Sequence, residues 1–115
     1  MSASIVLSKI LPLELSASSV SMESHGSLDV AWAPGDIFPV INWLRNQNVL
    51  ILGGDVIRRR ENLIDYCGDN WYFESSQATE KLDEQVDAAA DKAESYIRNY
   101  VAKNGPSFLF SLVVE

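Results

Sequence analysis

The most constraining feature of the sequence is a long amphipathic stretch, residues 77–103, which a helix stop and a strongly β-forming segment follow directly. Its apolar side chains recur at steps of three and four residues and so share one stripe of a helix: Leu82, Val86, Ala89, Ala90, Ala93, Tyr96, Ile97, Tyr100 and Val101. Gly105 and Pro106 end the helix, and residues 108–114 favour a strand. The pattern predicts a long helix that returns the chain to a sheet.

A second helix is predicted upstream, after a Pro-Gly-Asp turn signal. Asp36 is a plausible N-cap, and apolar residues at helical spacing continue to about Asn46. The preceding residues 16–28 are rich in Ser and Gly and are predicted to form a loop.

An uninterrupted apolar run, residues 49–52, indicates a short strand buried on both faces. Gly53 and Gly54 close this run, and residues 55–57 extend it after a bulge or bend. The three arginines at 58–60 are expected in an exposed connection.

The next segment is predicted to turn and then form an aromatic strand. Gly68-Asp69-Asn70 is a turn signal, and residues 71–74 are predicted as a strand. Helices and strands do not alternate strictly, so we predict an α+β fold. It has a small, mostly antiparallel sheet of three or four strands with two or three helices packed on it. The 115 residues fit a single domain 1–115, with a loosely defined segment 1–28 and a core 29–114.

The charge balance is acidic, with a formal net charge of −7. Such a surface repels phosphate backbones, so we expect no nucleic-acid binding, and it favours encounter with a basic protein. No apolar run approaches the length of a membrane span, so we expect no membrane contact. Because the chain has a single cysteine and can form no intramolecular disulfide, we expect it in the reducing cytoplasm.

Catalytic and metal chemistry have few residues to use. His25 is the only histidine and lies in a Ser/Gly-rich stretch, whereas Cys67 is the only cysteine and has no CxxC partner. One Cys and one His cannot make a Cys/His metal cluster. We therefore expect a protein that is not an enzyme, with no cofactor and no metal.

Glycine-based phosphate binding is also disfavoured, because neither GxGxxG nor GxxxxGK[ST] is present. Gly53 and Gly54 are instead expected to let a buried strand bend or approach another backbone closely. Asp55 is expected to hold the turn, and Trp71 completes this structural motif.

The carboxylates are unevenly distributed along the chain. Residues 65–94 hold nine acids against two lysines. Three- and four-residue steps place five of the acids on one face of the long helix. The alternatives are a solvated face or a docking surface for a basic partner. The candidate partner-binding residues are Asp65, Asp69, Glu74, Glu80, Glu84, Asp87, Asp91 and Glu94.

Two stretches carry a resemblance to a known group of proteins. Residues 51–56 read Ile-Leu-Gly-Gly-Asp-Val, and residues 70–72 read Asn-Trp-Tyr, before a helix with Tyr96-Ile97 and an apolar terminal strand. This order resembles the small immunity proteins of bacterial polymorphic toxin and contact-dependent inhibition systems, in particular immunity family forty, over roughly residues 30–114.

The resemblance implies a non-enzymatic antidote that binds a cognate toxin and blocks its active site or substrate surface. A basic nuclease domain is one candidate for that toxin, and the antidote is expected as a monomer or weak homodimer. The alternative is a generic adaptor or assembly subunit of a larger complex.

Overall fold

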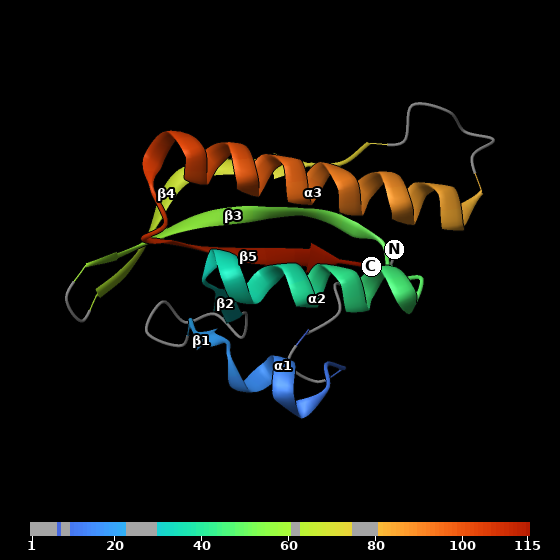
Figure 1. The fold of residues 1–115 in the computed structure, drawn as a ribbon, viewed down its shortest axis with the longest axis horizontal. Helices are drawn as coiled ribbons and strands as arrows, with labels where there is room; N and C mark the ends of the chain where they lie inside the picture. The colour runs from blue at the N-terminus through green and yellow to red at the C-terminus, as the bar shows by residue number, and fades with distance from the viewer. Residues whose placement is uncertain (1–6, 8–9, 23–29, 61–62, 75–80) are drawn as a thin grey trace.

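The computed structural model describes residues 7, 10–22, 30–60, 63–74 and 81–115. In chain order its elements are α1 (Leu13–Ala17), β1 (Val20–Ser21), β2 (Val30–Trp32), α2 (Pro34–Asn46), β3 (Ile51–Arg60), β4 (Leu63–Tyr72), α3 (Leu82–Asn104) and β5 (Phe108–Val114). Figure 1 shows the two long helices side by side across one sheet.

The strands form a five-stranded sheet in the order β1-β2-β5-β3-β4, and every neighbouring pair is antiparallel. The predicted α+β class, the antiparallel sheet and the long helix in the C-terminal half are confirmed. β1 and β2 raise the strand number above the predicted three or four. They span only two and three residues, which is too short to produce an alternating pattern, and β1 lies in the stretch predicted as loop.

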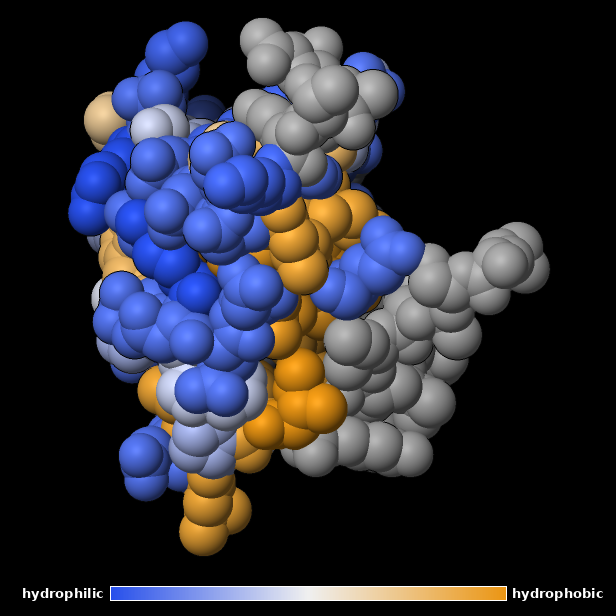
Figure 2. Space-filling view, turned by 90° about the vertical axis from the view of Figure 1, so that its right-hand side faces the viewer, coloured by the Kyte–Doolittle hydropathy of each residue, from blue (hydrophilic) through white to orange (hydrophobic). Residues whose placement is uncertain are grey.

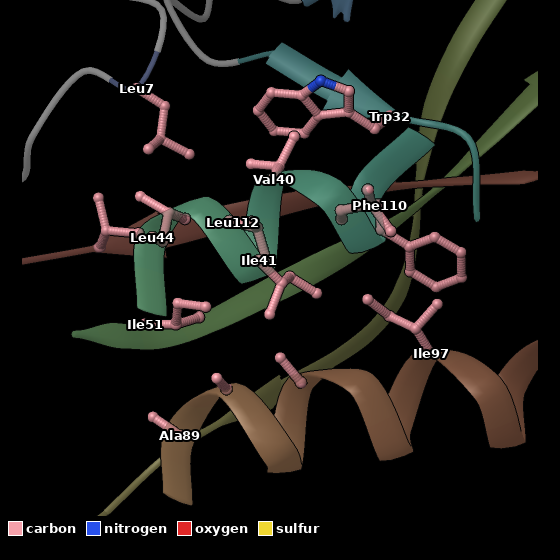
Figure 3. Close-up of a cluster of buried hydrophobic side chains, with 14 of the residues drawn as sticks. Leu7, Trp32, Val40, Ile41, Leu44, Ile51, Ala89, Ile97, Phe110 and Leu112 are labelled. Atoms are coloured by element: carbon pink, nitrogen blue, oxygen red, sulfur yellow. The ribbon is translucent and has the colours of Figure 1, made fainter. Parts of the chain in front are cut away.

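The main core lies between the helices and one face of the sheet. From the helices it takes Ile37, Val40, Ile41 and Leu44 of α2, and Ala89, Ala90, Ala93 and Ile97 of α3. Ile51, Val56, Phe110 and Leu112 meet them from the central strands. Figure 3 shows members of this core between α2, α3 and the sheet, with Ile41, Ile51 and Ile97 among those labelled. Most of this core comes from the two helices and two strands that the hydrophobic pattern predicted.

The N-terminal segment contributes to the same core. Leu7 and Leu11 are buried in it, and the indole Nε1 of Trp32 donates a hydrogen bond of 3.0 Å to the carbonyl oxygen of Leu15. This bond ties α1 to β2, so the described part of the segment packs against the core 29–114.

The opposite face of the sheet carries no described helix. A smaller cluster of Met22, Ala31, Ile57 and Leu109 is buried there. Because side chains alternate along a strand, Gly53 and Asp55 face the same way as Ile57. This second face, which we call the open face, holds the pocket described below.

Both long helices begin differently from the prediction. α2 starts at Pro34 with Ala33 as its N-cap residue, and the Ala33 carbonyl accepts the Asp36 and Ile37 amides. The prediction of Asp36 as N-cap is therefore wrong, because proline at the first helical position already starts the turn. α3 begins at Leu82, and residues 77–80 of the predicted helix lie outside the described residues.

The predicted helix stripe and stop are largely as expected. Val86, Ala89, Ala90, Ala93 and Ile97 are buried, and Gly105 ends α3 at a φ of 89°. Leu82 is the exception, because it is 51% exposed in the first turn of α3.

Three expectations about the strands are wrong. Asp55 lies inside β3, paired with a strand on each side, and does not hold a turn. Residues 58–60 are the end of β3 and not a connection, and residues 68–70 lie inside β4 and not in a turn. Between Asp55 and Ile57 the β3–β4 register shifts, so that β4 bulges there. Gly68 takes a φ of 88° in this bulge. A local glycine signal thus marks an irregular strand here, because pairing along β3 keeps the chain extended on both sides.

Candidate functional site

The two sequence stretches that carry the resemblance are neighbours in the sheet. Gly53 pairs with Tyr72, Gly54 pairs with Trp71, and Asp55 pairs with Asn70. Gly53, Gly54 and Asp55 also pair on their other side with β5. The six residues therefore form one continuous patch of β3 and β4 backbone.

Gly54 faces the helices and makes room for Trp71. A Cβ at Gly54 would overlap the carbonyl oxygen of Ser111 and lie 2.8 Å from Cζ3 of Trp71. The Trp71 ring stacks on Tyr96 of α3 with ring centroids 4.8 Å apart, and Trp71 is only 6% exposed. Trp71 is thus part of the core, and the glycine allows it to lie flat on the strand.

Gly53 faces the open side and forms the floor of a pocket. A Cβ there would overlap the carbonyl oxygen of Trp71 and lie 2.9 Å from Cα of Tyr72. The pocket has a volume of about 260 Å³. Its lining residues are Leu52, Gly53, Gly54, Asp55, Asn70, Trp71, Tyr72 and Val113. Glycine at position 53 lets the β3 backbone lie close to the β4 backbone beneath this hollow.

The side walls of this pocket are exposed. Tyr72 is 64% exposed and Val113 is 37% exposed. Among the tryptophans, Trp32 and Trp71 are buried and Trp43 is half-buried, whereas Tyr72 is exposed. Tyr72 is therefore the aromatic side chain that a partner can reach most readily.

A second hollow, of about 480 Å³, lies around the β4 end of the sheet. Asn70, Trp71 and Tyr72 line both hollows, and Glu74 and Lys92 join them in the second. The Lys92 ammonium donates a hydrogen bond of 2.6 Å to the Tyr72 carbonyl and lies 5.8 Å from the centroid of the Tyr72 ring. Tyr72 thus lines the pocket on the open face and also contacts Lys92 of α3.

The acidic row of α3 has partners within the chain. Nη2 of Arg45, from α2, lies 2.8 Å from Asp91 Oδ1 and 3.6 Å from Glu94 Oε1. Its Nε lies 3.9 Å from Asp87 Oδ1, and Nη1 of Arg98 lies 3.8 Å from Glu94 Oε2. The three carboxylates therefore converge on the seam between α2 and α3, and two guanidinium groups offset part of their charge.

The other described candidate acids lie on β4, just after its end and in the first turn of α3. Asp65, Asp69, Glu74 and Glu84 are exposed, and Glu80 lies outside the described residues. Asp65 lies opposite Arg58 in the β3–β4 ladder. The seven described candidate residues thus do not form one continuous patch, because three gather at Arg45 and the other four lie on β4, just after its end and in the first turn of α3.

Asp69 has a structural contact across to α3. The Tyr100 hydroxyl donates a hydrogen bond of 2.8 Å to Asp69 Oδ2. Burial first, and then this bond to a carboxylate, raise the pKa of Tyr100 to about 12. The contact fixes the β4 bulge against the helix, which explains how an exposed acid contributes to the fold.

The catalytic alternatives gain little support. Burial is the main cause that raises the pKa of the Cys67 thiol, and the nearby Asp69 and Asp65 raise it further against the opposing Arg58. His25 lies outside the described residues. Within the described part, no three His, Cys, Asp or Glu side chains are grouped as a metal ion would require. Nor does any described helix combine the length and apolar character needed to cross a bilayer.

Sequence reasoning missed Arg45, Asn70 and Val113 as parts of these sites. Arg45 sits in the last turn of α2, where a basic residue is already explained by the helix dipole. Its ion pairs with the acids of α3 depend on α3 lying beside α2, and no local sequence pattern predicts that arrangement. Val113 is one apolar residue in an apolar strand, and only the alternation along β5 distinguishes its open-face position.

Comparison with known proteins adds a direct finding. The family model described as Immunity protein 40 matches residues 21–114. Searches of curated proteins and of solved structures each gave no match. The matched range includes the paired stretches 51–56 and 70–72, and it takes in well over half of the chain. The chain therefore belongs to the Immunity protein 40 family.

Proposed function

We propose that this chain binds one cognate toxin domain in a one-to-one complex and blocks its active site or substrate surface, without catalysing a reaction. Membership of an immunity family supports a toxin-neutralising role in general. The site of action in this proposal is the cytoplasm of the producing cell or its sibling.

The observation that carries the proposal is the set of exposed carboxylates on β4, just after its end and in the first turn of α3. Glu74 and Glu84 are both exposed, as is Asp69. On a chain with a net charge of −7, such groups steer a basic protein toward the surface that bears them. A nuclease toxin needs a basic surface to hold phosphate, so it is a partner of matching charge.

The acids at the α2–α3 seam have a lesser part in this proposal. Arg45 and Arg98 offset the charge of Asp87, Asp91 and Glu94, so these carboxylates attract a distant basic surface more weakly. They contribute mainly as a rim around the exposed acids.

The test is a double charge reversal with a control of equal charge. The test variant is Glu74→Lys, Glu84→Lys. The control is Glu14→Lys, Asp36→Lys, which makes the same change at two exposed positions in the first turns of α1 and α2. Association with a candidate toxin domain, sought in the neighbouring genes, is measured by surface plasmon resonance at several salt concentrations.

We expect the test variant to associate about tenfold more slowly than the control at low salt, with the difference shrinking as salt rises. Equal rates for the two variants would show that the exposed acids do not guide binding. Absence of any complex with the wild-type chain would contradict the antidote proposal itself.

The non-enzymatic part of the proposal is tested separately. The double variant His25→Ala, Cys67→Ala removes both residues that a nucleophilic or acid–base mechanism would use. We expect cells carrying it to survive toxin expression as wild-type cells do. Loss of protection by a variant that still binds the toxin would instead indicate a catalytic role.

A further inference from the structure

The pocket above Gly53 has the form of a site for a single side chain. At about 260 Å³ it lies below the range of about 300–1,000 Å³ that is usual for small-molecule sites. It is open on the face of the sheet that carries no described helix. Binding hot spots at protein interfaces are often pockets of this kind, into which one anchor side chain inserts.

The walls of the pocket combine apolar surface with one negative charge. Leu52, Val113 and the Tyr72 ring are apolar walls, and Asp55 is the single charged residue that lines it. Figure 2 views the end of the molecule at which β3 begins and β5 ends. A band of hydrophobic residues runs down this end, beside hydrophilic residues. An occupant with an apolar stem and a positive tip would complement these walls.

We propose that this pocket receives an arginine side chain of the toxin, a proposal that rests on the function proposed above. Its methylene groups would lie against Val113 and Leu52, and its guanidinium would lie over the exposed ring of Tyr72 and near Asp55. Arginine fits better than lysine, because a planar, weakly hydrated guanidinium stacks on aromatic rings and pairs with carboxylates. The acidic balance of the whole chain favours the same charge.

The backbone geometry fixes the floor of the pocket. Its floor at Gly53 has no side chain, and a Cβ there would overlap the backbone of β4. The hollow is held by pairing of β3 with strands on both sides. It therefore requires no rearrangement before a side chain enters, which lowers the cost of binding.

Two pairs of variants test the pocket against the toxin domain that the wild-type chain binds. Tyr72→Ala removes the aromatic wall, and Tyr66→Ala is its control. Tyr66 lies on the same strand, pairs with Ile57 of the open face and is 45% exposed, but it does not line the pocket. Val113→Lys places a positive charge at the pocket, and Val113→Gln is an uncharged control of similar length.

We expect Tyr72→Ala to weaken toxin binding about thirty-fold, as loss of a hot spot does. Val113→Lys should weaken it at least about tenfold more than Val113→Gln, because like charges repel at close range. Tyr66→Ala should bind as wild type. Melting temperatures close to wild type would show that the variants fold. Wild-type affinity in both Tyr72→Ala and Val113→Lys overturns the pocket proposal. Toxin binding would still be observed in that case, so the proposed function would stand.

The chemistry of the occupant is tested without the toxin. N-acetyl-arginine methylamide is titrated into the labelled chain, with the neutral isostere N-acetyl-citrulline methylamide as the matched probe, and backbone amide shifts are followed by NMR. We expect saturable shifts at Gly53, Gly54 and Tyr72 with the arginine probe alone, and their loss in Asp55→Asn. Equal shifts with both probes, or no shifts with either, overturn the assignment of arginine.

Discussion

Gly54 offers the sharpest test of how the fold is held together. Gly54→Ala adds one methyl group where the carbonyl oxygen of Ser111 and the ring of Trp71 already occupy the space. Cζ3 of Trp71 would lie 2.8 Å from the new Cβ, well inside the optimal carbon contact of about 3.5–4.0 Å. Neither neighbour can withdraw easily. Trp71 is stacked on Tyr96, and the Ser111 oxygen belongs to the backbone of a central strand.

The magnitude follows from these contacts. Overpacking a core by a methyl group costs about 1–3 kcal/mol, and the involvement of backbone places this case at the upper end. We therefore expect a loss of about 3 kcal/mol in the free energy of unfolding. For a domain of this size, that loss lowers the melting temperature by about 12 °C.

Gly35→Ala is the matched control. It makes the same chemical change in the first turn of α2, where no atom lies within 4 Å of the added Cβ. Alanine in that helical position should stabilise the chain by up to about 1 kcal/mol. Thermal unfolding by circular dichroism and urea unfolding measure both variants. If Gly54→Ala is as stable as Gly35→Ala, the close approach of β3, β5 and Trp71 is not as described.

Three further predictions concern the charged and titrating contacts. Arg45→Gln should lose about 1–2 kcal/mol in urea unfolding, because it loses three surface ion pairs of about 0.2–1 kcal/mol each, and the loss should shrink at high salt; an effect that is independent of salt would contradict this account. Since the pKa of Tyr100 is raised from 10.0 to about 12 in the folded chain, its contribution to stability is complete below pH 10 and disappears between pH 10 and about 12. Tyr100→Phe should flatten that decline in a pH series of unfolding curves, and Asp69→Asn should lower the pKa seen in a spectrophotometric titration; an unchanged pKa would show that the bond between them has no influence. Because burial raises the pKa of Cys67, its thiol should react more slowly with an alkylating reagent at pH 8 in the folded chain than in urea, and equal rates would disprove its burial.

The elements with the longest periodic patterns were predictable from the sequence. The stripe from Val86 to Ile97 needed only helical spacing to locate α3 and its buried face. The strand that follows Pro106 was equally clear from its β-forming residues. Together they were sufficient for the fold class, because a long helix between strands must pack on their sheet.

Features that depend on distant partners were not predictable in the same way. Gly68 signals a turn locally, yet pairing with β3 makes it part of a bulged strand. The acids at 87 and 91 have the same helical spacing as Glu84, but Arg45 of another helix sets them apart. The pocket requires Val113 and Tyr72 to flank Gly53, although they are far apart in the sequence. Tertiary pairing decides each case, and local spacing cannot report it.

The adjacent glycines at 53 and 54 are constrained on opposite faces of the sheet, and this restricts how the surface can change over evolution. Gly54 lies against Trp71 on the core side of β3, and Gly53 lies beneath the hollow on the opposite side of the same strand. A substitution at either position disturbs the backbone of a neighbouring strand, so neither can be adjusted freely to suit a different partner. New specificities are accessible instead at side chains that surround the hollow, such as Tyr72 and Val113, whose exposure lets them vary at little cost to folding. The constrained glycines and the adaptable contacts thus lie next to one another on β3 and its two neighbouring strands.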